Sequence, residues 1–195
     1  LLGMWAWLPA YLGAAAQAGV FGRTSGTMLE FGVLLSGLTY LTSMLGSFIG
    51  GALSDHWGRT LTILLFSCAS LACSFTFGWM FGLPLSLLFA VAALYNFSSI
   101  ADSSIYSTAL TELVEPRHIG AAYSVRSAMG FSAGAVSPWV FGLVLDIVRA
   151  ASSTSDHLAW GLAWTSLGLG ALVGPVVTLR LRMHPGAARM AGGLR

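Results

Sequence analysis

The sequence predicts an all-α integral membrane protein built as a bundle of six transmembrane helices. Three observations lead to this fold class. Hydrophobic residues make up 56% of the chain and charged residues only 8%, whereas an ordinary soluble domain has about 25% charged residues. The mean hydropathy is +0.79. The apolar residues also gather in long continuous runs, so many of them must face lipid rather than water.

The apolar runs are the candidate spans, because a helix needs about 20 mostly apolar residues to cross the hydrocarbon core. None of them alternates apolar and polar residues as a membrane-spanning strand does. The first run lacks a charged segment before it, so it is not a signal peptide, and we expect it to belong to a longer protein. The predicted spans form one domain over residues 1–182, at positions 1–16, 29–53, 61–81, 84–113, 119–148 and 158–179.

The arginines predict the orientation of the bundle. One set of connections carries Arg59, Arg117 and the four arginines after the last span, whereas the opposite set carries Arg23 and Arg149. Cytoplasmic loops are richer in positive charge, so the first set and the C-terminus are predicted to be cytoplasmic, in a bacterial inner membrane. Residues 183–195 are rich in Gly, Ala and Arg, and we expect a disordered cytoplasmic tail there.

Tryptophans add a second expectation about depth. Trp79, Trp160 and Trp164 fall near the predicted outer ends of spans, and Trp57 falls near an inner end. Indole rings favour the membrane–water interface because one edge is polar and the rest is apolar. We therefore expect these four side chains at the two membrane surfaces.

The turn between the second and third spans has a distinctive sequence, Gly51-Ala-Leu-Ser-Asp-His-Trp-Gly-Arg-Thr. Two spans must reverse here within a few residues, and Gly58 can adopt the positive φ that such a reversal requires. Asp55 can interact with the N-terminus of a neighbouring helix. Arg59 can pair with a carboxylate at the end of an adjacent span.

These residues resemble the signature of the major facilitator superfamily, G-x-L-x-D-R-x-G-R-[RK], through Gly51, Leu53, Asp55, Gly58 and Arg59. His56 and Thr60 depart from the pattern. The next turn on the same side, with Glu112, Arg117 and Gly120, is also similar to that family, and we therefore expect Glu112 to pair with Arg59. The resemblance implies the C-terminal half of the fold (TM7–TM12), a missing N-terminal six-helix half as partner, and a cytoplasmic gate formed by these two turns.

Polar side chains form a stripe on the fourth predicted span. Plotted as a helix they fall within an arc of about 140°, and a polar stripe in a span should face water or protein rather than lipid. Asp102 lies deep in this span, at a depth similar to that of Arg126 on the next one. An ion pair that a proton or an anionic substrate can break is one hypothesis, and a permanent structural pair is the other. The candidate substrate or coupling residues are Asn96, Ser99, Asp102, Ser103, Tyr106 and Arg126.

The fifth predicted span carries small or bending residues at every fourth position, namely Gly130, Gly134, Pro138 and Gly142. Residues four apart lie on neighbouring positions of one helix face, so this pattern permits close helix contact and a proline bend. It resembles the pattern of the fifth helix in each half of the family. Ordinary packing of small residues explains it equally well.

The resulting functional prediction is secondary active transport of a small solute by alternating access, with protons as candidate coupling ions. The alternative is a family member that does not transport and acts as a sensor or an assembly partner. An enzyme is not expected, because His56, His118, His157 and His184 all lie in turns or the tail and no P-loop is present. The expected partners are the solute, the lipid bilayer and the other half, with no cofactor, metal or nucleic acid.

Overall fold

The computed structural model describes residues 1–18, 28–151 and 155–194, and helices dominate it throughout. No strand occurs within these described ranges. Three short 3-10 helices supplement the α-helices: η1 (Phe77–Met80), η2 (Pro116–His118) and η3 (Pro185–Gly193). The α-helices are α1 (Leu2–Ala18), α2 (Met28–Trp57), α3 (Arg59–Thr76), α4 (Leu85–Leu113), α5 (Ile119–Ala150), α6 (Asp156–Ala171) and α7 (Val173–Met183).

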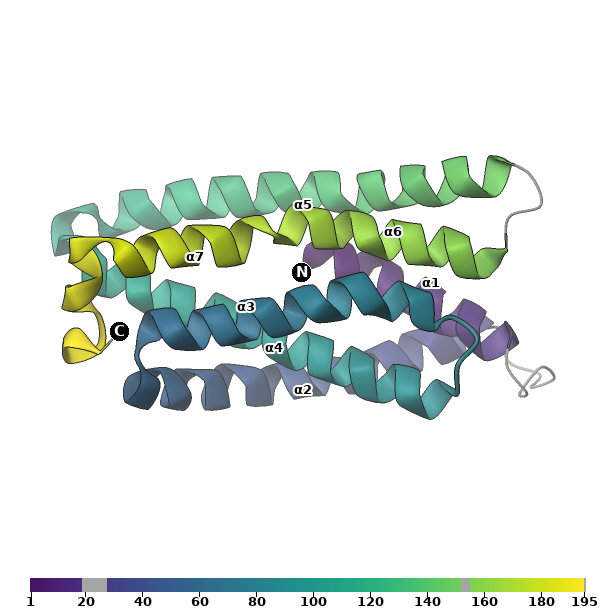
Figure 1. Cartoon of the computed structure of the whole chain (residues 1–195), viewed down its shortest axis with the longest axis horizontal. Coiled ribbons are helices and arrows are strands. Elements are labelled where there is room, and N and C mark those ends of the chain that lie inside the picture. Colours follow the sequence, from purple (N-terminus) through teal and green to yellow (C-terminus); the bar gives the residue numbers. More distant parts are fainter. Residues whose placement is uncertain (19–27, 152–154, 195) are drawn as a thin grey trace.

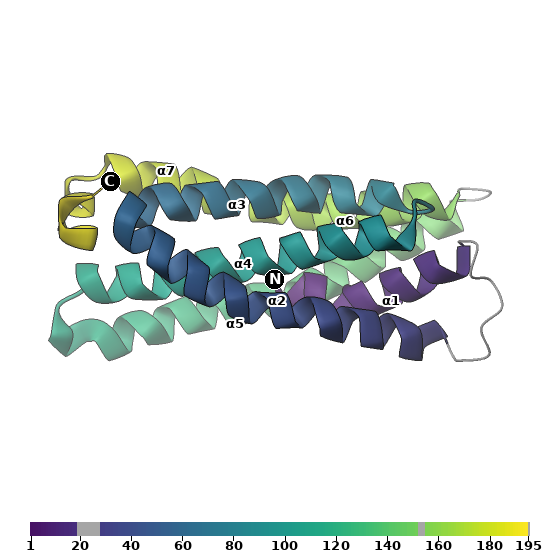
Figure 2. The same cartoon turned by 90° about the horizontal axis from the view of Figure 1, so that it is seen from below.

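The helices run along one common axis and alternate in direction (Figure 1). The α2–α3 turn, the α4–α5 turn and the C-terminus gather at one end of the bundle in both views (Figure 1, Figure 2). We call this the C-terminal end. The turns that the arginines assign to one membrane face therefore do share one end of the molecule, while the identity of that face stays a prediction.

The bundle is membrane-embedded. Among the described residues, five helical segments are long and apolar enough to cross a membrane: Gly32–Trp57, Arg59–Met80, Leu85–Leu113, Pro116–Ala150 and Asp156–Met183. The first predicted span corresponds to α1, whose 17 residues place it outside this set. Large apolar side chains on α2 and α5 point outward, with Phe48 75% and Met129 70% exposed. Such surfaces are compatible with lipid and not with water.

The main core is aromatic and lies away from the C-terminal end. The Tyr11 hydroxyl donates to the Phe77 carbonyl at 2.7 Å. The Tyr11 ring packs against Trp160 and Trp164, and the Phe77 ring packs against Trp164. Both tryptophans are buried, so their indole rings contact protein, while their depth near the outer membrane surface stays a prediction. The apolar face of α1 binds them, a tertiary contact that position along a span does not reveal.

The last membrane-crossing segment is bent between α6 and α7. Leu172 lies at the break, three residues before Pro175. Proline has no N–H to donate to the carbonyl four residues earlier and its ring crowds that carbonyl, so the bend follows from Pro175. The segment still crosses the bundle as one unit, since the backbone N–H of Val176 donates to the Leu172 carbonyl at 3.4 Å.

Candidate functional site

Three charged side chains join α2, α3 and α4 at the C-terminal end, and we call Asp55, Arg59 and Glu112 the charge cluster. The Arg59 guanidinium lies 2.5 Å from the Asp55 carboxylate and 2.9 Å from the Glu112 carboxylate. It also donates to the Ser54 hydroxyl at 2.5 Å. Arg59 is buried, with 7% of its surface exposed. The predicted pairing of Arg59 with Glu112 is confirmed.

The geometry of the α2–α3 turn creates this cluster. Gly58 alone separates the two helices, and its φ of 91° and ψ of 149° are essentially restricted to glycine. The chain therefore reverses at one residue, and α3 begins directly at Arg59. The positive φ predicted for Gly58 is confirmed. Of the other motif residues, Gly51 and Leu53 are half-buried on the last turns of α2.

The C-terminal tail docks onto the charge cluster. The backbone N–H of Ala191 donates to the Glu112 carboxylate at 3.0 Å. Met190 and Ala187 are fully buried and pack with Ala109 on the last turns of α4. The tail is therefore ordered as η3, whereas its composition led us to expect disorder. Ala187 and Met190 are the tail residues that pack on α4. Two apolar residues in a Gly- and Ala-rich segment form too weak a pattern to predict this docking from the sequence.

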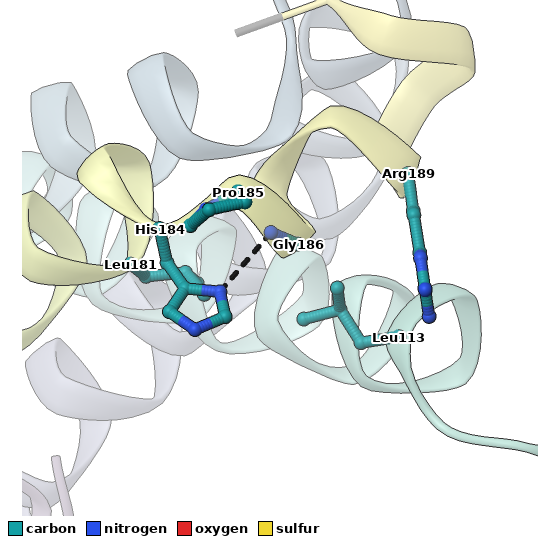
Figure 3. A pocket seen from close by; sticks show the side chains of 6 residues that line it. All are labelled: Leu113, Leu181, His184, Pro185, Gly186 and Arg189. Carbon is teal, nitrogen blue, oxygen red and sulfur yellow. Dashed lines mark hydrogen bonds between the residues drawn. The ribbon is translucent and has the colours of Figure 1, made fainter.

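A pocket of about 640 Å³ lies between the tail and the end of α4 (Figure 3). The His184 ring accepts a hydrogen bond from the Gly186 N–H at 3.0 Å, which fixes the start of η3. The Arg189 side chain extends beside Leu113 in the same view. The pocket exists because the tail folds back over α4, and its lining is Leu113, Leu181, His184, Pro185, Gly186 and Arg189.

Arg117 lies outside the charge cluster. It pairs with Glu115 at 2.8 Å, and both side chains are largely exposed. We expected Arg117 to belong to the same gate motif as Glu112, but in the structure it pairs with Glu115 instead. Arg117 lies within the short helix η2, beyond the end of α4, where its side chain is exposed.

The polar stripe of α4 faces protein, as predicted, but it serves several different neighbours. The Asn96 amide accepts from the Trp5 indole at 2.8 Å and donates to the Thr39 hydroxyl at 3.1 Å. Asn96 also donates to the Ala92 carbonyl at 3.1 Å and is fully buried. In this arrangement Asn96 joins α1, α2 and α4, and its hydrogen bonds are made within the protein.

Further along α4 the stripe contacts α3 and α7. The Ser67 hydroxyl donates to the Asp102 carboxylate at 3.0 Å. Tyr106 and Thr178 share a hydrogen bond of 2.5 Å. Ser99 is buried between these positions and Asn96. These residues therefore link α4 to neighbouring helices, and none of these contacts uses Arg126.

Arg126 reaches α4 from α5 without pairing with Asp102. Its guanidinium donates to the Ser107 hydroxyl at 2.9 Å and to the Ser103 carbonyl at 3.1 Å. Asp102 instead faces Ser67 on α3. Consecutive helix residues point about 100° apart, so Ser103 can face α5 while Asp102 faces another helix. Equal depth on two helices does not specify direction, which is why the hypothesised ion pair is not formed in this structure.

A cleft of about 750 Å³ opens beside Arg126, between the first residues of the sequence, Leu1 to Gly3, and helices α4, α5 and α6. Among the described residues that line it, Arg126 is the one charged side chain. The hydroxyls of Ser103, Ser127, Ser137 and Ser166 add polar groups to walls that are otherwise largely apolar. We refer to this space as the cleft. It combines a cation, hydroxyl groups and apolar surface, which suits a small solute.

Two of the predicted packing glycines bring α1 against α5. A Cβ atom at Gly134 would overlap the Leu2 side chain, and one at Gly142 would lie 2.9 Å from the Trp7 ring. The Trp7 indole also donates to the Pro138 carbonyl at 2.9 Å. These positions therefore act in close helix packing, the plainer of the two interpretations of the pattern.

Gly130 differs from those glycines. A Cβ atom there would meet nothing within 4 Å, and Gly130 lines the cleft one turn beyond Arg126. Its lack of a side chain keeps that part of the cleft open.

The charge cluster and the cleft are thus the two candidate sites, because each brings charged and polar side chains from several helices together. No family model, curated protein or solved structure matches this chain. A functional assignment therefore starts from the geometry of these two sites and from the motif in the α2–α3 turn.

Proposed function

We propose that the chain is the C-terminal six-helix half of an alternating-access secondary transporter of the major facilitator type, which moves a small solute. The observation that carries this proposal is the Arg59 pairing with both Asp55 and Glu112. It joins the G-x-L-x-D-x-x-G-R turn to the end of α4. An alternating-access transporter needs contacts that close one end of its pathway and can separate again.

The charge cluster is suited to such a reversible contact. The Asp55 side chain is 62% exposed and that of Glu112 is 26% exposed, whereas that of Arg59 is 9% exposed. Exposed ion pairs contribute only about 0–1 kcal/mol, because water solvates the separated charges nearly as well. Opening this end therefore costs less than separating a fully buried pair, which is expensive. In this account the cluster is a gate at the cytoplasmic end.

The cleft is the proposed solute compartment. Its polar groups lie on α4, α5 and α6 within the spans, and transporters of this kind bind solutes near the bilayer midplane between two halves. The N-terminal six-helix half would cover the open side of the cleft. Asp102, the described carboxylate deepest in a span, is the candidate for proton coupling.

The test is two-sided accessibility of the cleft. Ser127→Cys, in a Cys68→Ala/Cys73→Ala background, places one thiol in the cleft. A membrane-impermeant maleimide is applied to right-side-out and to inside-out vesicles that contain the complete parent protein. Alternating access predicts labelling from both sides, each incomplete at short times. Labelling from one side only, or from neither, contradicts transport and favours a sensor or assembly role.

Proton coupling has its own readout in the same assay. A protonophore collapses the proton gradient and should change the ratio of labelling from the two sides. In Asp102→Asn the ratio should no longer respond, while total labelling persists. A response that is unchanged in Asp102→Asn removes Asp102 from the coupling role without affecting the transport proposal.

A further inference from the structure

The charge of Arg126 lacks a counter-charge in the described part of the chain. Its two hydrogen-bond partners, the Ser107 hydroxyl and the Ser103 carbonyl, are both neutral. The Tyr123 ring lies 6.0 Å from the guanidinium carbon and adds only a weak attraction. None of the ion pairs between described residues includes Arg126. A cation is thus held inside a span by dipoles alone.

The Arg126 charge without a counter-charge is energetically unfavourable, and a bound anion would relieve this cost. An arginine at the centre of a span costs at least about 2.5 kcal/mol unless it is paired or hydrated, and Arg126, two turns inside α5, carries part of that cost. Guanidinium carries five N–H donors in a planar fork that matches a carboxylate. The two hydrogen bonds to α4 use part of these donors and hold the group at the cleft wall. The remaining donors can bind a carboxylate in the cleft.

The walls of the cleft beyond Arg126 indicate what the rest of the ligand should be. Gly130 lies one turn further along α5 and leaves that wall without a side chain. Phe131 and Leu167 contribute apolar surface to the cleft. A ligand with its carboxylate at Arg126 would therefore place an apolar body against Gly130. A strongly hydrated ion would gain nothing from this surface.

We propose that Arg126 binds the carboxylate of a small organic anion whose apolar part lies along Gly130. The inference rests on the proposed function only where it takes this anion to be the transported solute. Binding itself requires the cleft and Arg126, and it can be measured without transport.

The experiment uses the complete parent protein in phosphatidylcholine nanodiscs and follows thermal unfolding by tryptophan fluorescence. The probes are benzoate and phenylacetate, with benzamide and phenylacetamide as neutral controls of the same shape. At tenfold excess over its dissociation constant, a bound carboxylate should raise the unfolding midpoint by about 1–3 °C. The amides should not change it.

Variants locate the effect at Arg126. Arg126→Gln should abolish the carboxylate response, and Arg126→Lys should weaken it because a bidentate contact is lost. Arg149→Gln is the matched control, since Arg149 is an exposed arginine paired with Asp156 at the other end of α5. It should leave the response intact.

Gly130→Val provides a second test that leaves the arginine in place. The new side chain enters open space, so the protein should fold normally while the carboxylate response falls at least tenfold in apparent affinity. Gly37→Val is its control, because a Cβ atom at Gly37 on α2 also meets nothing within 4 Å. That variant should respond as the unmodified protein does.

Three results would overturn the inference: no response to either carboxylate, an equal response to the amides, or a response that survives Arg126→Gln.

Phosphatidylglycerol in the nanodiscs distinguishes a lipid phosphate from a solute. If it abolishes the carboxylate response, a lipid headgroup occupies Arg126 and the solute assignment is wrong. Two-sided labelling of Ser127→Cys without carboxylate binding refutes this inference alone, whereas binding without two-sided labelling refutes the transport proposal alone.

Discussion

The Glu112 carboxylate accepts from the Arg59 guanidinium, most closely at 2.9 Å, and one of its oxygens also accepts the N–H of Ala191 at 3.0 Å. One side chain at the end of α4 thus holds both the start of α3 and the C-terminal tail. A change at Glu112 must therefore affect two contacts, and variants can separate them.

Arg59 and Glu112 should be energetically coupled. In a double-mutant cycle of Arg59→Gln and Glu112→Gln, the interaction should contribute about 1 kcal/mol, because Arg59 is buried and Glu112 is partly exposed. The free energy of unfolding in mixed micelles measures it. The equivalent cycle of Arg117→Gln and Glu115→Gln should give a smaller value, since that pair is exposed. Additive effects of the Arg59 and Glu112 changes would contradict the pairing.

Gly58 should tolerate no side chain. Gly58→Ala forces a Cβ atom into a backbone conformation that is essentially limited to glycine, and should destabilise the protein by about 1–3 kcal/mol. Gly51→Ala is the control in the same motif, because it lies within α2 and its Cβ atom meets nothing within 4 Å. That change should be neutral or slightly stabilising. Equal thermal unfolding midpoints for the two variants would show that the turn is not as described.

The tail should be held by Met190. Met190→Asp replaces a fully buried side chain by a charge, so η3 should detach. Amide hydrogen exchange over residues 185–194 should then accelerate at least tenfold. Leu194→Asp, at a position that is 47% exposed, should leave the rate unchanged. If exchange is already fast in the unmodified protein, the tail does not dock on α4 as it does here.

The glycines of α5 should differ in their tolerance of alanine. Gly142→Ala places a methyl group 2.9 Å from the Trp7 ring and should cost about 1–3 kcal/mol of unfolding free energy. Gly130→Ala enters open space and should be neutral or stabilising. Thermal unfolding in nanodiscs compares them directly. A larger loss at Gly130 than at Gly142 would mean that α1 does not pack on α5 in this register.

Much of the fold was predictable because membrane insertion depends on local composition. The five apolar segments, the shared end of the two turns, and the left-handed Gly58 all follow from residue type and spacing. The pairing of Arg59 with Glu112 followed from the family resemblance, since no local rule brings positions 53 residues apart together.

Contacts that depend on helix rotation were less predictable. The direction of Asp102 is set by how α4 packs on α3, and a one-residue difference separates it from Ser103, which faces Arg126. Burial of Trp160 and Trp164 depends on the aromatic face of α1 in the same way. The docking of Met190 rests on shape alone. These three features depend on how the assembled helices pack, so the sequence alone does not predict them.

The most direct test of the account neutralises the gate and follows the cleft. Ser127→Cys labelling from the C-terminal side of the bundle is compared in Glu112→Gln and in Glu115→Gln, which removes a carboxylate at the same end but outside the charge cluster. We predict that Glu112→Gln increases labelling from this side several-fold and decreases it from the opposite side, while Glu115→Gln changes neither. Equal labelling in the two variants would contradict a gate built on Arg59 and Glu112.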